Sequence, residues 1–222
     1  MQRSSKSIRM EKLYERCLIK DLYIAKSNIL VTLVSLVVLG LGLSFLLETS
    51  ALLILAPVVS TTAVFISITS DATSKWNKNV ITMPVSRSAI IGEKFIFYML
   101  LAVLGVIAAL VPCMLLAFIG AKITMYSLYL YGIIGVSATL LAGGISLPCA
   151  YLFDPEKSQI VFMMSFMAST GIIVGLVFFI NIFIPVKEHI LLVFSMVLAI
   201  AAVWFLISYK ITAKVYQKQD IY

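Results

Sequence analysis

The chain has little of the chemistry on which enzymes and metal sites depend. Its single histidine is His189, so motifs that need two histidines, HExxH among them, are excluded. Its three cysteines, Cys17, Cys113 and Cys149, are scattered and form no CxxC or Cys/His spacing, so no disulfide framework or zinc site follows. No GxxxxGK[ST] loop is present to bind a nucleoside triphosphate. We therefore expect no catalytic residues, no metal site and no cofactor in this chain.

Charged residues are also scarce, at 12% against 62% hydrophobic residues, and the apolar residues gather in six long blocks. Each block holds enough apolar residues for the roughly 20 that a helix needs to cross a bilayer core. A soluble domain cannot bury six such runs, and a membrane β-barrel would alternate apolar and polar residues. The sequence thus predicts an all-α membrane protein with six transmembrane helices. The predicted spans are Ile29–Leu47, Ala51–Thr69, Phe95–Ile119, Tyr126–Phe153, Ile160–Ile184 and Ile190–Tyr209.

The basic residues are distributed unevenly between the two sides of the membrane that six spans create. Fifteen of the 17 Lys and Arg residues fall on one side, and only Lys122 and Lys187 fall on the other. Because segments rich in Lys and Arg stay in the cytoplasm, we expect a multi-pass protein of the cell membrane with both termini cytoplasmic. The net charge of +7 is then matched to anionic membrane lipid, and no nucleic acid partner is expected.

This topology divides the chain into regions. Residues 1–28 form a cytoplasmic segment, residues 29–209 the six-helix transmembrane domain with a polar elbow at 70–94, and residues 210–222 a cytoplasmic tail. Residues 10–25 carry apolar side chains at helical spacing, which predicts an amphipathic interfacial helix, although an ordinary charged lead-in to span one is the alternative. The N-terminus is too long and polar for a cleaved signal peptide, so span one is expected to remain as an anchor.

Span two is the most polar of the six spans. Ser60 and Ser67 share one helical face, and Thr62 and Thr69 share a neighbouring face. Small hydroxyl residues within a membrane mark either contact between helices or the lining of a pathway, and four in one span favour an interior face. Asn181, near the outer end of span five, is either a membrane-interface residue or part of the same pathway.

The spans carry no ionisable residue at depth, where ion-coupled carriers keep one. The energy for any transport is therefore expected to come from outside this chain. Span five also contains Gly171 and Gly175, a GxxxG packing motif that arises frequently by chance in apolar helices.

The polar elbow between spans two and three is the richest cytoplasmic stretch. Asp71 and Lys75 are spaced i, i+4, which supports a continuation of span two past the membrane. Pro84 ends regular helix, and Ser86 is placed to cap a new helix that begins at Arg87. That helix would run for 33 residues, about 50 Å against a bilayer core of about 30 Å. The elbow should protrude, either as an anchoring loop among lipids or as a docking surface for a cytoplasmic partner.

Short motifs stand at the cytoplasmic ends of the spans. They are Leu18-Ile19-Lys20-Asp21-Leu22; Lys75-Trp76 with Met83-Pro84-Val85-Ser86-Arg87 and then Ile90 and Lys94; and Phe153-Asp154-Pro155-Glu156-Lys157. In this combination with six spans, essentially the whole chain resembles permeases of the type-2 ABC exporter family, and most closely those that export amphipathic peptides such as phenol-soluble modulins or bacteriocins. Met83 replaces the usual Leu, and Asp154-Pro155 departs from the glycine often found there.

The resemblance implies a permease subunit that moves an amphipathic peptide or other hydrophobic substrate out of the cell. A separate ABC ATPase chain would bind ATP and Mg, and a second permease chain, identical or paralogous, would complete the dimer. The ATPase-coupling residues implied are Asp71, Lys75, Trp76, Lys78, Pro84, Ser86, Arg87 and Lys94, with a second contact at Glu156 and Lys157. The translocation-path residues implied are Ser60, Thr62, Ser67, Thr69 and Asn181.

Three other functions compete with this expectation. A ligand-binding membrane subunit of a small-molecule importer would need a pocket with convergent polar groups, for which the sequence shows no pattern. An intramembrane hydrolase would need a nucleophile with a nearby base, and the spans hold no His or Lys at depth. A scaffold or channel subunit would work without any ATPase.

Overall fold

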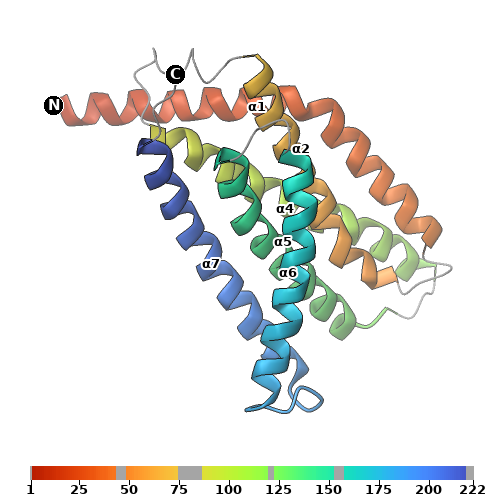
Figure 1. Cartoon of the computed structure of the whole chain (residues 1–222). Coiled ribbons are helices and arrows are strands. Elements are labelled where there is room, and N and C mark those ends of the chain that lie inside the picture. The colour runs from red at the N-terminus through yellow and green to blue at the C-terminus, as the bar shows by residue number, and fades with distance from the viewer. Residues whose placement is uncertain (1, 44–48, 75–86, 120–122, 153–157, 219–222) are drawn as a thin grey trace.

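The computed structural model describes residues 2–43, 49–74, 87–119, 123–152 and 158–218, and this part of the chain is almost entirely helical (Figure 1). Each of its six α-helices is long and apolar enough to cross a membrane. The predicted class, an all-α membrane protein with six spans, is therefore confirmed. In chain order the elements are α1 (Gln2–Leu43), η1 (Thr49–Ala51), α2 (Leu52–Thr73), α4 (Arg87–Phe118), α5 (Met125–Leu152), α6 (Ser158–Asn181) and α7 (Ile190–Lys218).

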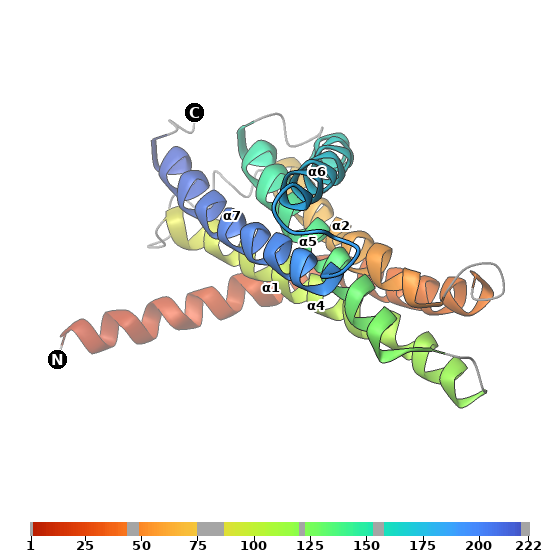
Figure 2. The same ribbon diagram turned by 90° about the horizontal axis from the view of Figure 1, so that it is seen from below.

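Helix α1 differs most from the sequence expectation. The segment expected to form an amphipathic interfacial helix and the expected span one belong to one continuous helix of 42 residues, which runs through the expected boundary between residues 28 and 29. No glycine or proline occurs before Gly40, and without a helix-breaking residue nothing ends the helix earlier. Figure 1 shows the helix bending: its first part crosses one end of the bundle and the remainder runs along the side. Figure 2 shows the N-terminal arm projecting beyond the other helices.

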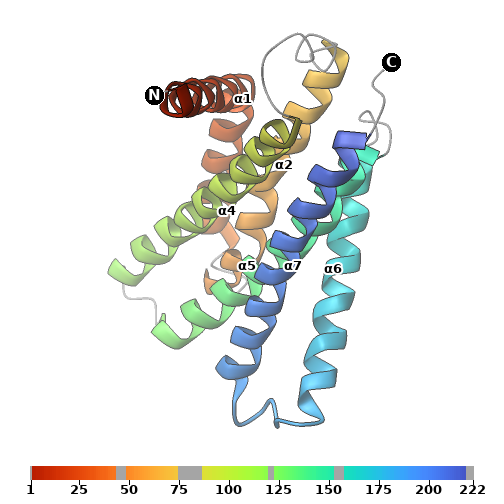
Figure 3. The same ribbon diagram turned by 90° about the vertical axis from the view of Figure 1, so that its left-hand side faces the viewer.

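Helix α4 begins at Arg87, where the proline and cap pattern predicts a helix start, and continues for 32 residues. At 1.5 Å per residue it is about 48 Å long, well beyond a bilayer core of about 30 Å. In Figure 3 it crosses the bundle diagonally, while α6 and α7 run side by side and are joined at the end opposite the termini. Both α1 and α7 have their terminal ends at the same end of the bundle, hereafter the terminal end.

Helices α2 and α5 form the centre of the bundle. In their spanning windows 61% and 67% of residues are buried, against 17% in α1 and 22% in each of α6 and α7. Helices α1 and α4 pack on one side of this central pair, and α6 and α7 pack on the other side. Helices α1, α6 and α7 therefore keep broad apolar faces uncovered within a single chain, as expected of surfaces that meet lipid or another subunit.

Two glycines allow the central helix α2 to lie unusually close to its neighbours. A Cβ atom on Gly135 of α5 would stand 2.1 Å from the carbonyl oxygen of Leu53. A Cβ atom on Gly105 of α4 would stand 2.6 Å from the carbonyl oxygen of Ala56. No side chain fits in either gap, so both contacts depend on glycine, as is usual where membrane helices approach closely.

Aromatic side chains fill the half of the bundle nearer the terminal end. Phe65 of α2 packs edge-on against Tyr98 of α4, with ring centroids 6.5 Å apart, and against Phe162 of α6 at 4.7 Å. The Tyr98 hydroxyl donates a hydrogen bond of 2.8 Å to the carbonyl oxygen of Thr139 on α5. This core ties α2, α4, α5 and α6 together directly beneath the polar site described next.

Candidate functional site

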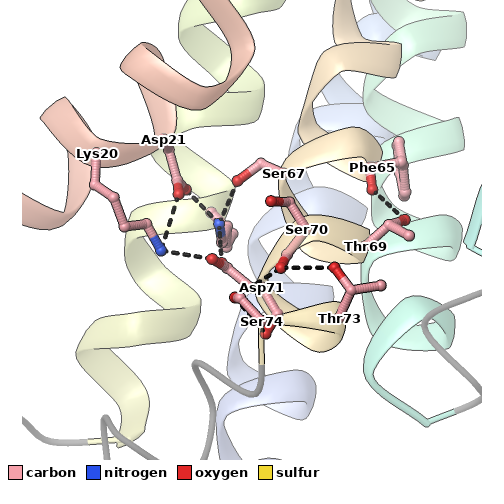
Figure 4. Close-up of polar contacts among 10 residues, drawn as sticks. Lys20, Asp21, Phe65, Ser67, Thr69, Ser70, Asp71, Thr73 and Ser74 are labelled. Carbon is pink, nitrogen blue, oxygen red and sulfur yellow. Dashed lines mark hydrogen bonds and ion pairs between the residues drawn. The ribbon is translucent and has the colours of Figure 1, made fainter.

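A group of charged and polar side chains joins three helices at the terminal end of the bundle. We call it the charge cluster; its members are Lys20 and Asp21 of α1, Ser67 and Asp71 of α2, and Glu93 and Lys94 of α4. Lys20 and Asp21 lie within α1, and every other member lies within two turns of a helix end, so the cluster joins three segments that are distant in sequence. Figure 4 shows the side chains from α1 and α2 pointing toward one another.

Lys94 is the centre of the charge cluster. Its ammonium group donates hydrogen bonds to the Asp21 carboxylate and, at 2.8 Å, to the Ser67 hydroxyl. Its Nζ also lies 2.8 Å from Oδ2 of Asp71. One lysine of α4 thus holds a carboxylate from α1 and both a carboxylate and a hydroxyl from α2.

Lys20 is the second lysine of the charge cluster and the more exposed of the two. Its Nζ lies 2.6 Å from Oδ1 of Asp71 and 3.4 Å from Oδ1 of Asp21. Asp71 therefore uses one oxygen for Lys20 and the other for Lys94, and links α1 to α4 through α2. Two lysines face two aspartates, so these four charges cancel.

The charge cluster is shielded from solvent. Asp21 is 0% exposed, Lys94 2% and Asp71 7%, whereas Lys20 is half-buried. Buried charges persist only when they are paired, and removing one partner of a buried pair costs about 3–5 kcal/mol because the other charge is left without compensation. Glu93 is buried too, and its Oε1 has no hydrogen-bond partner among the described residues. No group of three or more His, Cys, Asp or Glu residues in the described ranges is arranged to hold a metal ion.

The structure brings together two of the residues expected to couple to an ATPase. Asp71 and Lys94 pair with each other inside the protein. Arg87 is the first residue of α4, and its side chain lies outside the described part. The remaining residues of that set lie outside the described residues, and so does the expected pairing of Asp71 with Lys75. They are Lys75, Trp76, Lys78, Pro84, Ser86, Glu156 and Lys157.

The four hydroxyl residues of α2 meet different neighbours. Ser60 is buried at the close contact with Gly105 of α4, and its hydroxyl donates to the Ala56 carbonyl oxygen. Thr62 is half-buried and donates to the carbonyl oxygen of its own helix at Val59. Ser67 accepts a hydrogen bond from Lys94, as described above.

Thr69 connects α2 to α6. Its hydroxyl oxygen lies 2.9 Å from the hydroxyl oxygen of Ser158, the first residue of α6, and it donates to the Phe65 carbonyl oxygen. The end of α2 and the start of α6 are therefore adjacent. Asn181 lies at the opposite end, where its Oδ1 accepts a hydrogen bond of 3.0 Å from the Val186 backbone amide and so shapes the α6–α7 connection.

A cavity of about 740 Å³ opens at that opposite end, between α2, α5, α6 and α7. The size falls within the roughly 300–1,000 Å³ of ordinary ligand pockets. Its walls are almost wholly apolar, with Ile134, Phe166, Val177 and Phe194 among them. Its polar lining residues are Thr170, Asn181 and Lys187.

Sequence reasoning missed Lys20, Asp21 and Glu93 as members of a site. Their signal was present: Lys20 and Asp21 precede predicted span one, Asp71 follows span two, and Glu93 and Lys94 precede span three. Such groups must find partners when apolar helices pack around them. What the sequence could not supply was which of these residues meet.

Comparison with known proteins identifies one family. The family described as "ABC-2 family transporter protein" matches residues 17–217, which is most of the chain. No curated protein and no solved structure matches the chain significantly.

Proposed function

The chain belongs to the ABC-2 transporter family, and we propose that it is the permease of an exporter driven by a separate ATPase chain. Membership itself makes the chain a membrane-spanning permease subunit of an ABC transporter, a transport component that is not itself catalytic. The proposal adds the direction of transport, the partner and the substrate. The observation that carries it is the family match across residues 17–217 together with six spanning helices.

The ATPase is proposed to dock at the terminal end of the bundle, which the distribution of Lys and Arg assigns to the cytoplasm. Two segments expected to contact it, residues 75–86 and 153–157, connect α2 to α4 and α5 to α6. The contact of Thr69 with Ser158 supports a single docking area, because it makes the helix ends that flank these two segments neighbours. Helix α4 is long enough to extend into the cytoplasm from the same area.

A second permease chain is proposed to pack against α6. This helix is poorly covered within one chain, and Gly171 and Gly175 face open space, since a Cβ atom on either meets nothing within 4 Å. Membrane helices associate closely through GxxxG pairs that no other helix of the same chain covers. Helix α2 lies beside α6, so the route for substrate is proposed to run between α2 and α6 of the two chains, past Thr62 and Thr69.

The substrate is proposed to be an amphipathic peptide or another hydrophobic molecule. The cavity between α2, α5, α6 and α7 supports this class, because its walls are almost wholly apolar and carry a few polar residues, Thr170, Asn181 and Lys187. A vitamin-capturing subunit of an importer would instead enclose its ligand with several convergent polar groups. That alternative predicts tight binding of a small polar ligand by the purified chain alone.

Two measurements test the proposed function. The tagged chain is purified from its native membranes in mild detergent, and co-purifying proteins are identified; an ABC ATPase in stoichiometric amount is expected. The complex is then reconstituted in liposomes with a fluorescent, amphipathic helical peptide on the side of the ATPase. ATP-dependent movement of the peptide into the lumen supports export, whereas a chain that binds no ATPase and still works contradicts the proposal.

A further inference from the structure

The charge cluster lies at the base of the segment proposed to contact the ATPase. Asp71 stands two residues before the end of α2, and Lys94 is the eighth residue of α4. Residues 75–86 join these two helices. Because Nζ of Lys94 lies 2.8 Å from both Oδ2 of Asp71 and Oγ of Ser67, the two helices are pinned together next to the segment. A force on the segment therefore acts on a joined pair of helices.

Helix α1 is attached to the same pair through two consecutive residues. Asp21 accepts a hydrogen bond from Lys94 of α4, and Lys20 lies 2.6 Å from Asp71 of α2. Successive side chains leave a helix about 100° apart, so each of the two residues reaches a different partner. No glycine or proline occurs in α1 before Gly40. The N-terminal arm and the membrane span, which lie on either side of Lys20 and Asp21, therefore belong to one helix.

The chemistry of this attachment makes it resistant to sliding. Apolar side chains permit helices to shift past one another with little change in contact. Charge-assisted hydrogen bonds in a buried site hold a fixed register, because water cannot replace a lost partner there. Asp21 and Lys94 are both at least 98% buried, which places the bond between α1 and α4 in such an environment.

We propose that Lys20, Asp21, Asp71 and Lys94 are positioning residues that carry the nucleotide-driven movement of the 75–86 segment into α1. On this account α1 is a moving part of the coupling machinery, and its N-terminal arm, which projects beyond the bundle in Figure 2, is displaced together with the ends of α2 and α4. The inference rests on the proposed function, since it requires an ATPase to move the segment.

The test variant combines Lys20→Met with Asp21→Asn. It removes both charges of α1 from the charge cluster and leaves Asp71 paired with Lys94, so α2 and α4 remain joined and the buried charge remains balanced. The matched control is Lys26→Met, which removes an exposed charge from the same helix that belongs to none of the four ion pairs. The single variant Asp21→Asn is a milder form that cuts only the bond between α1 and α4.

The readout is the distance between two spin labels, which can be measured without knowing the substrate. Tyr23 of α1 is 79% exposed, and Lys210 of α7 is exposed, so both accept a label after substitution by cysteine. Cys17, Cys113 and Cys149 are first replaced by alanine. The distance distribution is measured in nanodiscs with the co-purified ATPase, without nucleotide and with ATP and vanadate. ATPase co-purification, ATP hydrolysis and thermal unfolding are measured on the same samples.

In the parent chain and in Lys26→Met, we expect the nucleotide to shift the distance between the labels. In Lys20→Met/Asp21→Asn we expect most of that shift to disappear while the ATPase still co-purifies, and Asp21→Asn should lose part of it. A full shift in the double variant would overturn the inference, and so would a parent chain whose ATPase responds to nucleotide while α1 stays in place. A parent chain that recruits no ATPase would overturn the proposed function and the inference with it.

Discussion

Oδ2 of Asp71 in α2 and Nζ of Lys94 in α4 lie 2.8 Å apart, within a buried site that also receives Lys20 and Asp21 from α1. Asp71 and Lys94 flank the segment expected to contact an ATPase. In this structure they face each other. Their expected role in coupling is therefore tested by asking whether they hold α2 and α4, the helices on either side of that segment, together.

Replacement of Lys94 by methionine is expected to destabilise the protein strongly. Methionine keeps much of the side-chain volume but removes the buried cation, so the carboxylates of Asp21 and Asp71 are left facing Lys20 with one positive charge for two negative charges. The expected loss is about 3–5 kcal/mol, measured as a lower midpoint of thermal or denaturant unfolding in detergent. Glu93→Gln, at the adjacent buried position, should change stability far less. Equal effects of the two substitutions would contradict the pairing described here.

Gly135→Ala is expected to disturb the contact between α5 and α2. The new Cβ atom would stand 2.1 Å from the Leu53 carbonyl oxygen, so the helices must move apart. Overpacking of this kind costs about 1–3 kcal/mol, to be read from thermal unfolding. Gly132→Ala on the same helix is the control, because its Cβ atom meets nothing within 4 Å and alanine favours helix. A stable Gly135→Ala variant would show that the central helices are spaced differently.

Gly171→Ile combined with Gly175→Ile tests the proposed permease dimer. A Cβ atom at either position meets nothing within 4 Å in the described part of the chain, so the stability of the single chain should not fall. The bulk should nevertheless block close approach of a second α6, and the number of permease chains per nanodisc, counted by photobleaching, should fall from two to one. Gly42→Ile on α1, where a Cβ atom also meets nothing within 4 Å, should leave the dimer intact. A dimer that survives the double substitution must use another face.

Thr62→Leu is the sharper test of a translocation path along α2. Thr62 is half-buried and donates its hydrogen bond to the Val59 carbonyl oxygen of its own helix, so leucine should be accommodated while the polar surface at this position is lost. We expect slower ATP-dependent transport of the fluorescent peptide with unchanged ATPase association. Ser60→Leu is less informative, because Ser60 packs against Gly105 and a larger side chain would force α2 and α4 apart. Normal transport by the Thr62→Leu protein would remove this residue from the path.

Local signals in the sequence predicted much of the fold. Hydropathy located all six helices, and the pattern of Pro84 and Ser86 before Arg87 predicted where α4 begins. The continuity of α1 was missed, because the change from charged to apolar residues was interpreted as a boundary although no residue there breaks a helix.

The charge cluster could not be predicted by the same means. Helical spacing offers Asp71 a partner four residues away, but its observed partner Lys20 is 51 positions distant. Spacing also places Ser60 and Ser67 on one face without showing that one meets the backbone of α4 and the other meets Lys94. Such partners are fixed by tertiary packing, and the roles of these residues in coupling and in the path stay predictions.

The most direct test of the account places a photo-reactive amino acid at Trp76, in the segment between α2 and α4, and irradiates native membranes. The ATPase of the complex is the expected cross-linked protein, and the cross-linking yield should change with ATP and vanadate. The same amino acid at Phe183, in the connection between α6 and α7 at the opposite end of the bundle, should capture no ATPase. Cross-links from position 76 that reach lipid alone, in membranes where the chain is active, would contradict the account.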